Sequence, residues 1–230
     1  MKKNNLLLYH GLPLFVLVFP FIWLALVGND RALKGEAGIV ELATPLFLVI
    51  AIGFSISSLT ITRRLELSAY LKSWLLLLIV GATYFALEEL SYGQHMFGWD
   101  TADSWKELND QDETNLHNVH ALFDQVPRAL LTLGILVGGV VLPLYRHFRK
   151  IQLDESNRFY WQWPTLDCVS IGLMVILIRP IQMVHDSDVI STGESKEMFF
   201  ALFILLYGVS LHSRLKRKAA AQAPLADQGS

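Results

Sequence analysis

Cysteine is almost absent from this sequence of 230 residues, which contains only Cys168. A single cysteine excludes an internal disulfide bond, a cysteine-rich zinc site and a cysteine-ligated iron–sulfur cluster. The chain also has neither a Walker phosphate-binding loop nor a glycine-rich dinucleotide fingerprint. Any chemistry is therefore expected to depend on carboxylate, imidazole and guanidinium side chains.

Charged residues are scarce as well. Asp, Glu, Lys and Arg make up 17% of the chain and hydrophobic residues 53%, whereas soluble domains carry roughly a quarter charged residues. The mean hydropathy is positive. This composition predicts a multi-pass membrane protein.

Six apolar runs are long enough to cross a bilayer, which takes about 20 helical residues. The first could be mistaken for a signal peptide, but it is long, contains two prolines and lacks a small-residue cleavage site. We therefore predict an all-α, polytopic membrane helix bundle of six transmembrane helices in residues 1–212. Residues 213–230 are predicted to be a basic and then disordered tail. The six runs are 6–28, 39–59, 71–92, 126–145, 166–185 and 193–211.

Lysine and arginine are distributed unequally between the predicted loops, and the side that is richer in them is cytoplasmic. With the amino terminus inside, only five of these residues fall outside: Arg31, Lys34, Lys106, Arg128 and Lys196. All others except Arg179, which lies within a span, fall on the inner side. We expect a bacterial inner-membrane protein with both termini in the cytoplasm.

The third apolar run ends in two adjacent carboxylates, Glu88 and Glu89. Counted from an inner boundary near Ser73 at 1.5 Å per residue, they lie about 5 to 7 Å beneath the outer boundary. Arg179 reaches a similar depth in the fifth run, where Pro180 removes one backbone donor. Charges at depth cost at least about 2.5 to 3.5 kcal/mol and therefore face the bundle interior. We predict that Arg179 pairs with one of the two glutamates beside a polar cavity.

The outer segment 93–126 is predicted to contain a short helix that descends toward these acids. Five polar side chains recur on one helical face: Glu113, His117, His120, Asp124 and Arg128.

These residue types allow two chemistries. Imidazole and carboxylate groups suit a divalent metal such as zinc, for which the candidate ligands are Glu89, His117, His120 and His185. Without a metal, paired carboxylates in a low dielectric can divide acid and base roles. Adjacent helical residues point about 100° apart, however, so one glutamate could face the cavity while the other pairs with Arg179.

The stretches "EELSYGQHMFGW" and "LNDQDETNLHN" resemble a signature of uncharacterised bacterial multi-pass inner-membrane proteins, over residues 86–120. That resemblance implies no particular activity. The glutamate pair also resembles the EExxxR motif of CAAX-type intramembrane proteases. Here Gly93 stands where that motif has arginine, and the later histidine motifs of those proteases have no counterpart at matching positions.

The leading interpretation is an integral membrane enzyme whose outward-facing polar site acts by hydrolysis or group transfer on a lipid or lipid-linked substrate. The candidate catalytic residues are Glu88, Glu89, His117, His120, Asp124 and Arg179. We expect membrane lipid as a partner and no nucleic acid. Two alternatives stay open: a proton-coupled transporter, because buried Glu, His and Arg also build proton relays, and a non-catalytic membrane assembly subunit.

Overall fold

The computed structural model describes residues 3–28, 33, 38–106, 119, 121–155, 157, 159–185 and 192–226. Within these ranges every regular element is a helix and no strand occurs, which confirms the all-α class. The elements are α1 (Lys3–Leu6), η1 (Leu7–Gly11), α2 (Leu12–Val27), α3 (Ile39–Arg64), α4 (Ala69–Glu89), η2 (Ser91–Gly93), α5 (Gln94–Phe97), α6 (Asp103–Lys106), α7 (Ala121–Gly134), η3 (Ile135–Val141), α8 (Leu142–Phe148), η4 (Leu166–Cys168), α9 (Val169–His185) and α10 (Thr192–Ala226).

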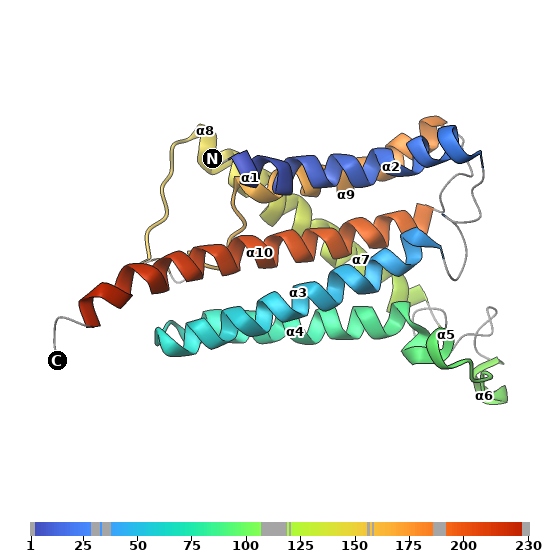
Figure 1. The fold of residues 1–230 in the computed structure, drawn as a ribbon, viewed down its shortest axis with the longest axis horizontal. Coiled ribbons are helices and arrows are strands. Elements are labelled where there is room, and N and C mark those ends of the chain that lie inside the picture. The colour runs from blue at the N-terminus through green and yellow to red at the C-terminus, as the bar shows by residue number, and fades with distance from the viewer. Residues whose placement is uncertain are drawn as a thin grey trace.

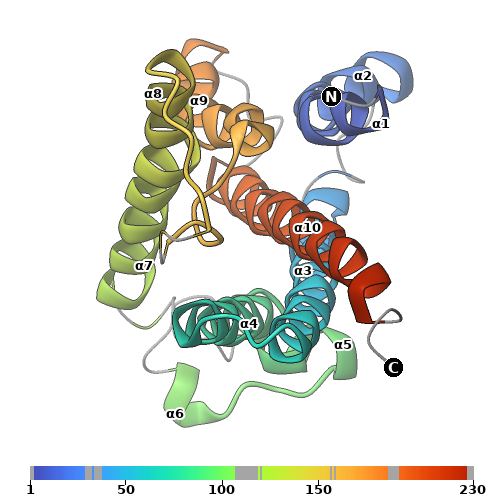
Figure 2. The same cartoon turned by 90° about the vertical axis from the view of Figure 1, so that its left-hand side faces the viewer.

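The long helices run side by side, and α10 lies at the centre of the bundle (Figure 1, Figure 2). The apolar window of α10 is 78% buried, against 11% to 33% in the other four long apolar helices. A helix that is apolar on every side is stable only when neighbours surround it. The segments α3, α4, α7 to α8, α9 and α1 to α2 encircle α10 in the end-on view (Figure 2).

Among the residues that the structure describes, five helices are long and apolar enough to cross a membrane: Leu7–Val27, Ile39–Arg64, Ala69–Glu89, Gln125–Phe148 and Gly193–Gln222. The fifth predicted run instead forms η4 followed by α9, and its apolar part, Leu166–Ile178, is shorter. Helix α9 continues through Pro180 to His185.

Large apolar side chains cover the outside of the bundle. Val49, Leu77, Val80 and Leu130 are each between 58% and 65% exposed. Such a surface is unfavourable in water but suits lipid tails, and helices satisfy their backbone hydrogen bonds internally as a bilayer requires. The chain is therefore a multi-pass membrane protein.

The helix boundaries differ from the predicted ones in three places. Helix α4 stops at Glu89, three residues before the predicted end, because the next residues leave the helical conformation. The helix that contains the predicted fourth span is longer than predicted, because α7 already includes Ala121, five residues before the predicted start at 126. Helix α10 continues through part of the predicted tail to Ala226, since that segment consists largely of the strong helix formers Ala, Leu, Lys, Arg and Gln.

Candidate functional site

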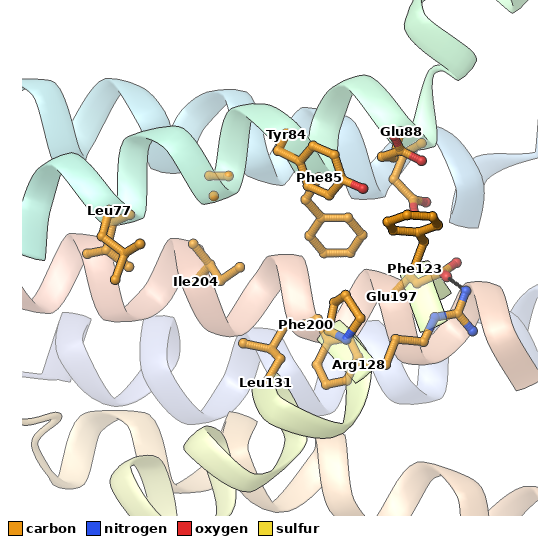
Figure 3. A pocket seen from close by; sticks show the side chains of 15 residues that line it. Leu77, Tyr84, Phe85, Glu88, Phe123, Arg128, Leu131, Glu197, Phe200 and Ile204 are labelled. Carbon is orange, nitrogen blue, oxygen red and sulfur yellow. Dashed lines mark hydrogen bonds and ion pairs between the residues drawn. The ribbon is translucent and has the colours of Figure 1, made fainter. Parts of the chain in front are cut away.

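A pocket of about 320 Å³ lies between α4, α7 and α10 (Figure 3). Most of its wall is apolar, and ionisable side chains stand at one end, where α4 finishes. From Leu77 to Glu89 the pocket follows α4 for 12 residues, or about 18 Å, which is more than half of the roughly 30 Å hydrocarbon core of a bilayer. The ionisable lining residues are Tyr84, Glu88, Glu89, Arg128 and Glu197.

Glu88 is 97% buried, with only 3% of its surface exposed. Its Oε1 accepts a hydrogen bond of 2.5 Å from the hydroxyl of Tyr92. A buried carboxylate is strongly disfavoured unless such donors compensate the loss of water. The tyrosine hydroxyl therefore fixes the position of this carboxylate at the pocket wall.

The backbone that carries Tyr92 after the end of α4 is strained. Ser91, Tyr92 and Gly93 have φ angles of 44°, 53° and 100°, a left-handed run that non-glycine residues rarely adopt. A Cβ atom on Gly93 would lie 3.1 Å from the ring of Trp99 and 3.2 Å from that of Phe97. Strain of this kind persists where packing enforces it, and it is concentrated at functional sites.

The residues that follow form a compact cap over the end of α4. The rings of Phe97 and Trp99 stack with centroids 5.7 Å apart. The side-chain amide of Gln94 donates a 2.8 Å hydrogen bond to the hydroxyl of Thr101. The stretch 88–101 thus has a defined local fold, which holds Tyr92 against Glu88.

Arg128 of α7 and Glu197 of α10 form an ion pair at the same end of the pocket (Figure 3). Their side chains are 32% and 11% exposed. Partly buried Glu89 interacts electrostatically with both members of this pair, as well as with Glu88 and Glu41. Among the described side chains, three carboxylates from two helices therefore share the pocket end with one guanidinium.

This arrangement can support two kinds of chemistry. Carboxylates that are close together in apolar surroundings differ in proton affinity, so one can accept a proton that another group donates. A guanidinium supplies donors that match a phosphate or carboxylate oxygen. The carboxylates and the guanidinium stand at the end of an apolar wall that suits a hydrocarbon chain.

The predicted site residues fall into two groups. Glu88 and Glu89 both line the pocket. Asp124 lies on α7, one turn before Arg128, and its side chain is outside the described residues. His117 and His120 lie outside the described residues altogether.

Arg179 and His185 both belong to α9, and their side chains are likewise outside the described part. The predicted pairing of Arg179 with the glutamates therefore stays a prediction. Figure 2 shows α9 and α4 on different sides of α10. The guanidinium that the structure describes at the pocket is that of Arg128.

A metal centre also stays a prediction. Among the side chains that the structure describes, no group of three His, Cys, Asp or Glu residues is arranged to hold an ion. The three histidines proposed as ligands have no described side chains. Carboxylate oxygens can ligate a divalent cation, and the described carboxylates at the pocket are those of Glu88, Glu89 and Glu197.

Arg128 was expected on the same polar helical face as Asp124, whereas Tyr92 and the ion pair of Arg128 with Glu197 were not predicted from the sequence. Arg128 is four residues after Asp124, which is the spacing of one helical face, whereas Tyr92 reaches Glu88 from a left-handed segment that follows the end of α4. Glu197 approaches only because α10 packs beside α7 and α4, and no local pattern reveals that. No family model, curated protein or solved structure matches the chain.

Proposed function

We propose that this chain is an integral membrane enzyme of a bacterial inner membrane that acts on a lipid or lipid-linked substrate by hydrolysis or group transfer. The observation that carries the proposal is the pocket, in which an apolar wall ends in three carboxylates and a guanidinium. A hydrocarbon chain that filled the apolar part would bring its polar group to Glu88 and Glu89. A pocket of about 320 Å³ is in the size range of small-ligand sites.

We further propose six spans, with residues 166–185 as the additional one and both termini in the cytoplasm. Support comes from the basic residues in the last turns of α3 and α8 and at positions 214–218 of α10. The carboxyl-terminal ends of these helices lie at the end of the bundle opposite the end of α4 (Figure 1). Basic loops face the cytoplasm. The acidic end would then open on the periplasmic side.

In the proposed reaction Glu89 acts as the general base. Its carboxylate accepts a proton from water, or from an acceptor hydroxyl, as that oxygen bonds to the electrophilic atom of an ester. The bond from that atom to the leaving oxygen then breaks, and protonated Glu89 returns the proton to the leaving oxygen. Arg128 stabilises the negative charge that develops on the ester oxygens.

The remaining predicted residues would extend this site. His117 and His120 would be zinc ligands or proton carriers, Asp124 would adjoin Arg128, and Arg179 would be a second anion clamp. Zinc held by the two histidines with Glu89 or His185 would supply Lewis-acid chemistry. The protein groups described above would still bind and orient the substrate.

The shape of the pocket favours an enzyme over a proton-coupled transporter. A transporter needs a polar path to both membrane surfaces, whereas the end of this pocket far from the carboxylates is lined by apolar residues such as Leu77 and Ile204 (Figure 3). A one-sided site suits a substrate that enters and leaves in one leaflet.

Lipid turnover by the purified protein tests the proposal. Wild-type protein in nanodiscs made from bacterial inner-membrane lipid extract is expected to consume one lipid species over time, as measured by mass spectrometry. Glu89→Gln removes the base but keeps the shape of the side chain. Because general bases contribute roughly 10² to 10⁴ in rate, we expect conversion to fall by at least about a hundredfold.

Asp100→Asn is the matched control, because it makes the same carboxylate-to-amide change on an exposed residue of the cap that does not line the pocket. It should turn over lipid at the wild-type rate. If wild type converts no lipid, or if Glu89→Gln converts it as fast as wild type, the enzymatic proposal is rejected. The first outcome would leave the assembly-subunit alternative.

A further inference from the structure

The pocket between α4, α7 and α10 is called the acidic pocket from here on. A second pocket, of about 750 Å³, lies at the opposite end of the bundle and is called the basic pocket. Helix α8, Arg214 of α10 and residues from the stretches 150–153 and 160–166 line it. Its ionisable lining residues are Arg146, His147, Lys150, Tyr160 and Arg214. No carboxylate lines it among the residues that the structure describes, so its electrostatic character is cationic.

The two arginines of this basic pocket are held by neutral groups. Arg146 donates to the carbonyl of Pro164 at 2.8 Å and to that of Leu142 at 3.3 Å. Arg214 donates to the carbonyl of Trp161 at 2.9 Å and, at longer range, to neighbouring carbonyls of the same segment. Carbonyl oxygens orient a guanidinium but do not neutralise its charge.

No carboxylate among the described lining residues balances the charge of these basic groups. In the described part of the chain, Arg146, Lys150 and Arg214 take part in no ion pair. The buried Nε of Arg214 has no hydrogen-bond partner. Asp167 interacts with Arg214 electrostatically, but it is not part of the lining, and its Oδ2 accepts hydrogen bonds from Thr165 and Ser210. Partly buried like charges of this kind are costly unless an anion joins them.

The rim of the pocket is apolar. Phe148, Ile151 and Leu166 are 76%, 44% and 39% exposed, and Trp163 lies beside them in the lining. Aromatic residues and apolar side chains next to basic ones are typical of a membrane–water interface, where headgroups meet acyl chains. A soluble anion would gain nothing from this rim.

We propose that the basic pocket binds an organic phosphate, and that its apolar rim selects the phosphate of an anionic phospholipid over a soluble one. Arginine presents paired donors that match two phosphate oxygens, and Arg146 and Arg214 supply these from two different elements. Lys150 adds a third charge at the pocket. The lipid would thereby connect α8 with α10 at the basic end of the bundle.

Lipid retention tests this proposal independently of any turnover. Delipidated full-length protein is titrated with phosphatidylglycerol, with phosphatidylcholine, or with glycerol 3-phosphate, and bound molecules are counted by native mass spectrometry. Wild type should retain phosphatidylglycerol at least about tenfold more strongly than phosphatidylcholine, because charge-assisted hydrogen bonds are the strong ones. Glycerol 3-phosphate alone should bind weakly.

Arg146→Gln should lower phosphatidylglycerol retention to the level of phosphatidylcholine. Arg149→Gln is the matched control, since Arg149 directly follows α8 but is not in the pocket lining, and it should behave as wild type. If Arg146→Gln fails to fold, Lys150→Gln replaces it, because Lys150 is exposed and its side chain makes no described hydrogen bond.

Equal retention of the two lipids by wild type, or an equal loss in Arg149→Gln, would overturn the proposal. Glycerol 3-phosphate that binds as strongly as phosphatidylglycerol and depends on Arg146 would overturn the lipid preference and leave a site for soluble phosphates. Loss of phosphatidylglycerol binding in Arg146→Gln or Lys150→Gln, with the control intact, supports the lipid site.

Discussion

The contact between η3 and α10 gives a sharp stability prediction, because two adjacent glycines of η3 have different surroundings. A Cβ atom added to Gly139 would lie 2.6 Å from a ring carbon of Phe203. Favourable carbon–carbon contacts are about 3.5 to 4.0 Å, so the ring would have to move by about 1 Å. A Cβ atom on Gly138 would meet nothing within 4 Å.

The size of the effect follows from how freely Phe203 can move. Its side chain is 7% exposed, and its ring stacks on that of Tyr207 with centroids 6.5 Å apart. Overpacking in a tight core costs about 1 to 3 kcal/mol. Both Gly139→Ala and Gly138→Ala gain the same helix propensity, at most about 1 kcal/mol, so the difference between them isolates the clash.

We therefore expect Gly139→Ala to have a free energy of unfolding about 1 to 3 kcal/mol lower than Gly138→Ala. The assay is reversible unfolding of purified protein in mixed micelles, with denaturing detergent as the variable and circular dichroism or tryptophan fluorescence as the signal. Equal stability of the two variants, or a more stable Gly139→Ala, would refute the packing between η3 and α10.

Three further predictions concern the pockets. Gly81→Leu places a side chain in the acidic pocket and should lower the amount of co-purified lipid at least about tenfold. Gly53→Leu, at a helix glycine that also has open space but is not in the pocket lining, should leave that amount unchanged. Mass spectrometry of the bound lipid measures the difference. Loss of water and the neighbouring carboxylate raise the pKa of Tyr92 above its ordinary value of about 10. Its contribution to stability is therefore full below about pH 10 and lost as the pH rises above that, so Tyr92→Phe should unfold with a weaker alkaline dependence than wild type. If zinc is resident, elemental analysis of wild-type protein should find about one ion per chain, and replacement of His117 and His120 by Ala should remove it; no zinc in wild type would exclude a resident zinc site.

The helices could be predicted from the sequence because each apolar run is long and continuous. Their ends were less predictable. Helix α4 stops at Glu89 because Tyr92 and its neighbours adopt left-handed angles, which only the packing of the cap around Gly93 enforces. The length of α10 was underestimated, because the change from apolar to basic residues after Leu211 does not end the helix, which continues to Ala226.

The position of the candidate site along the helices could be predicted from the sequence, but the residues that approach it from other helices could not. Depth along a helix follows from counting residues, so Glu88 and Glu89 could be assigned to one end of the bundle. Which cation approaches them depends on how helices are arranged around α10. The described guanidinium, Arg128, comes from α7 and is held by Glu197 of α10, a contact between residues 69 positions apart.

The central helix determines how far apart the two pockets lie. Glu197 lines the acidic pocket and Arg214 lines the basic one, and the 17 residues between them span about 25 Å of α10. That distance is close to the roughly 30 Å thickness of the hydrocarbon core. Because α10 is one continuous and largely buried helix, it holds the two pockets at a fixed separation. In the proposed orientation the acidic pocket would lie near the periplasmic surface and the basic pocket near the cytoplasmic surface, which is the charge asymmetry that the positive-inside rule favours.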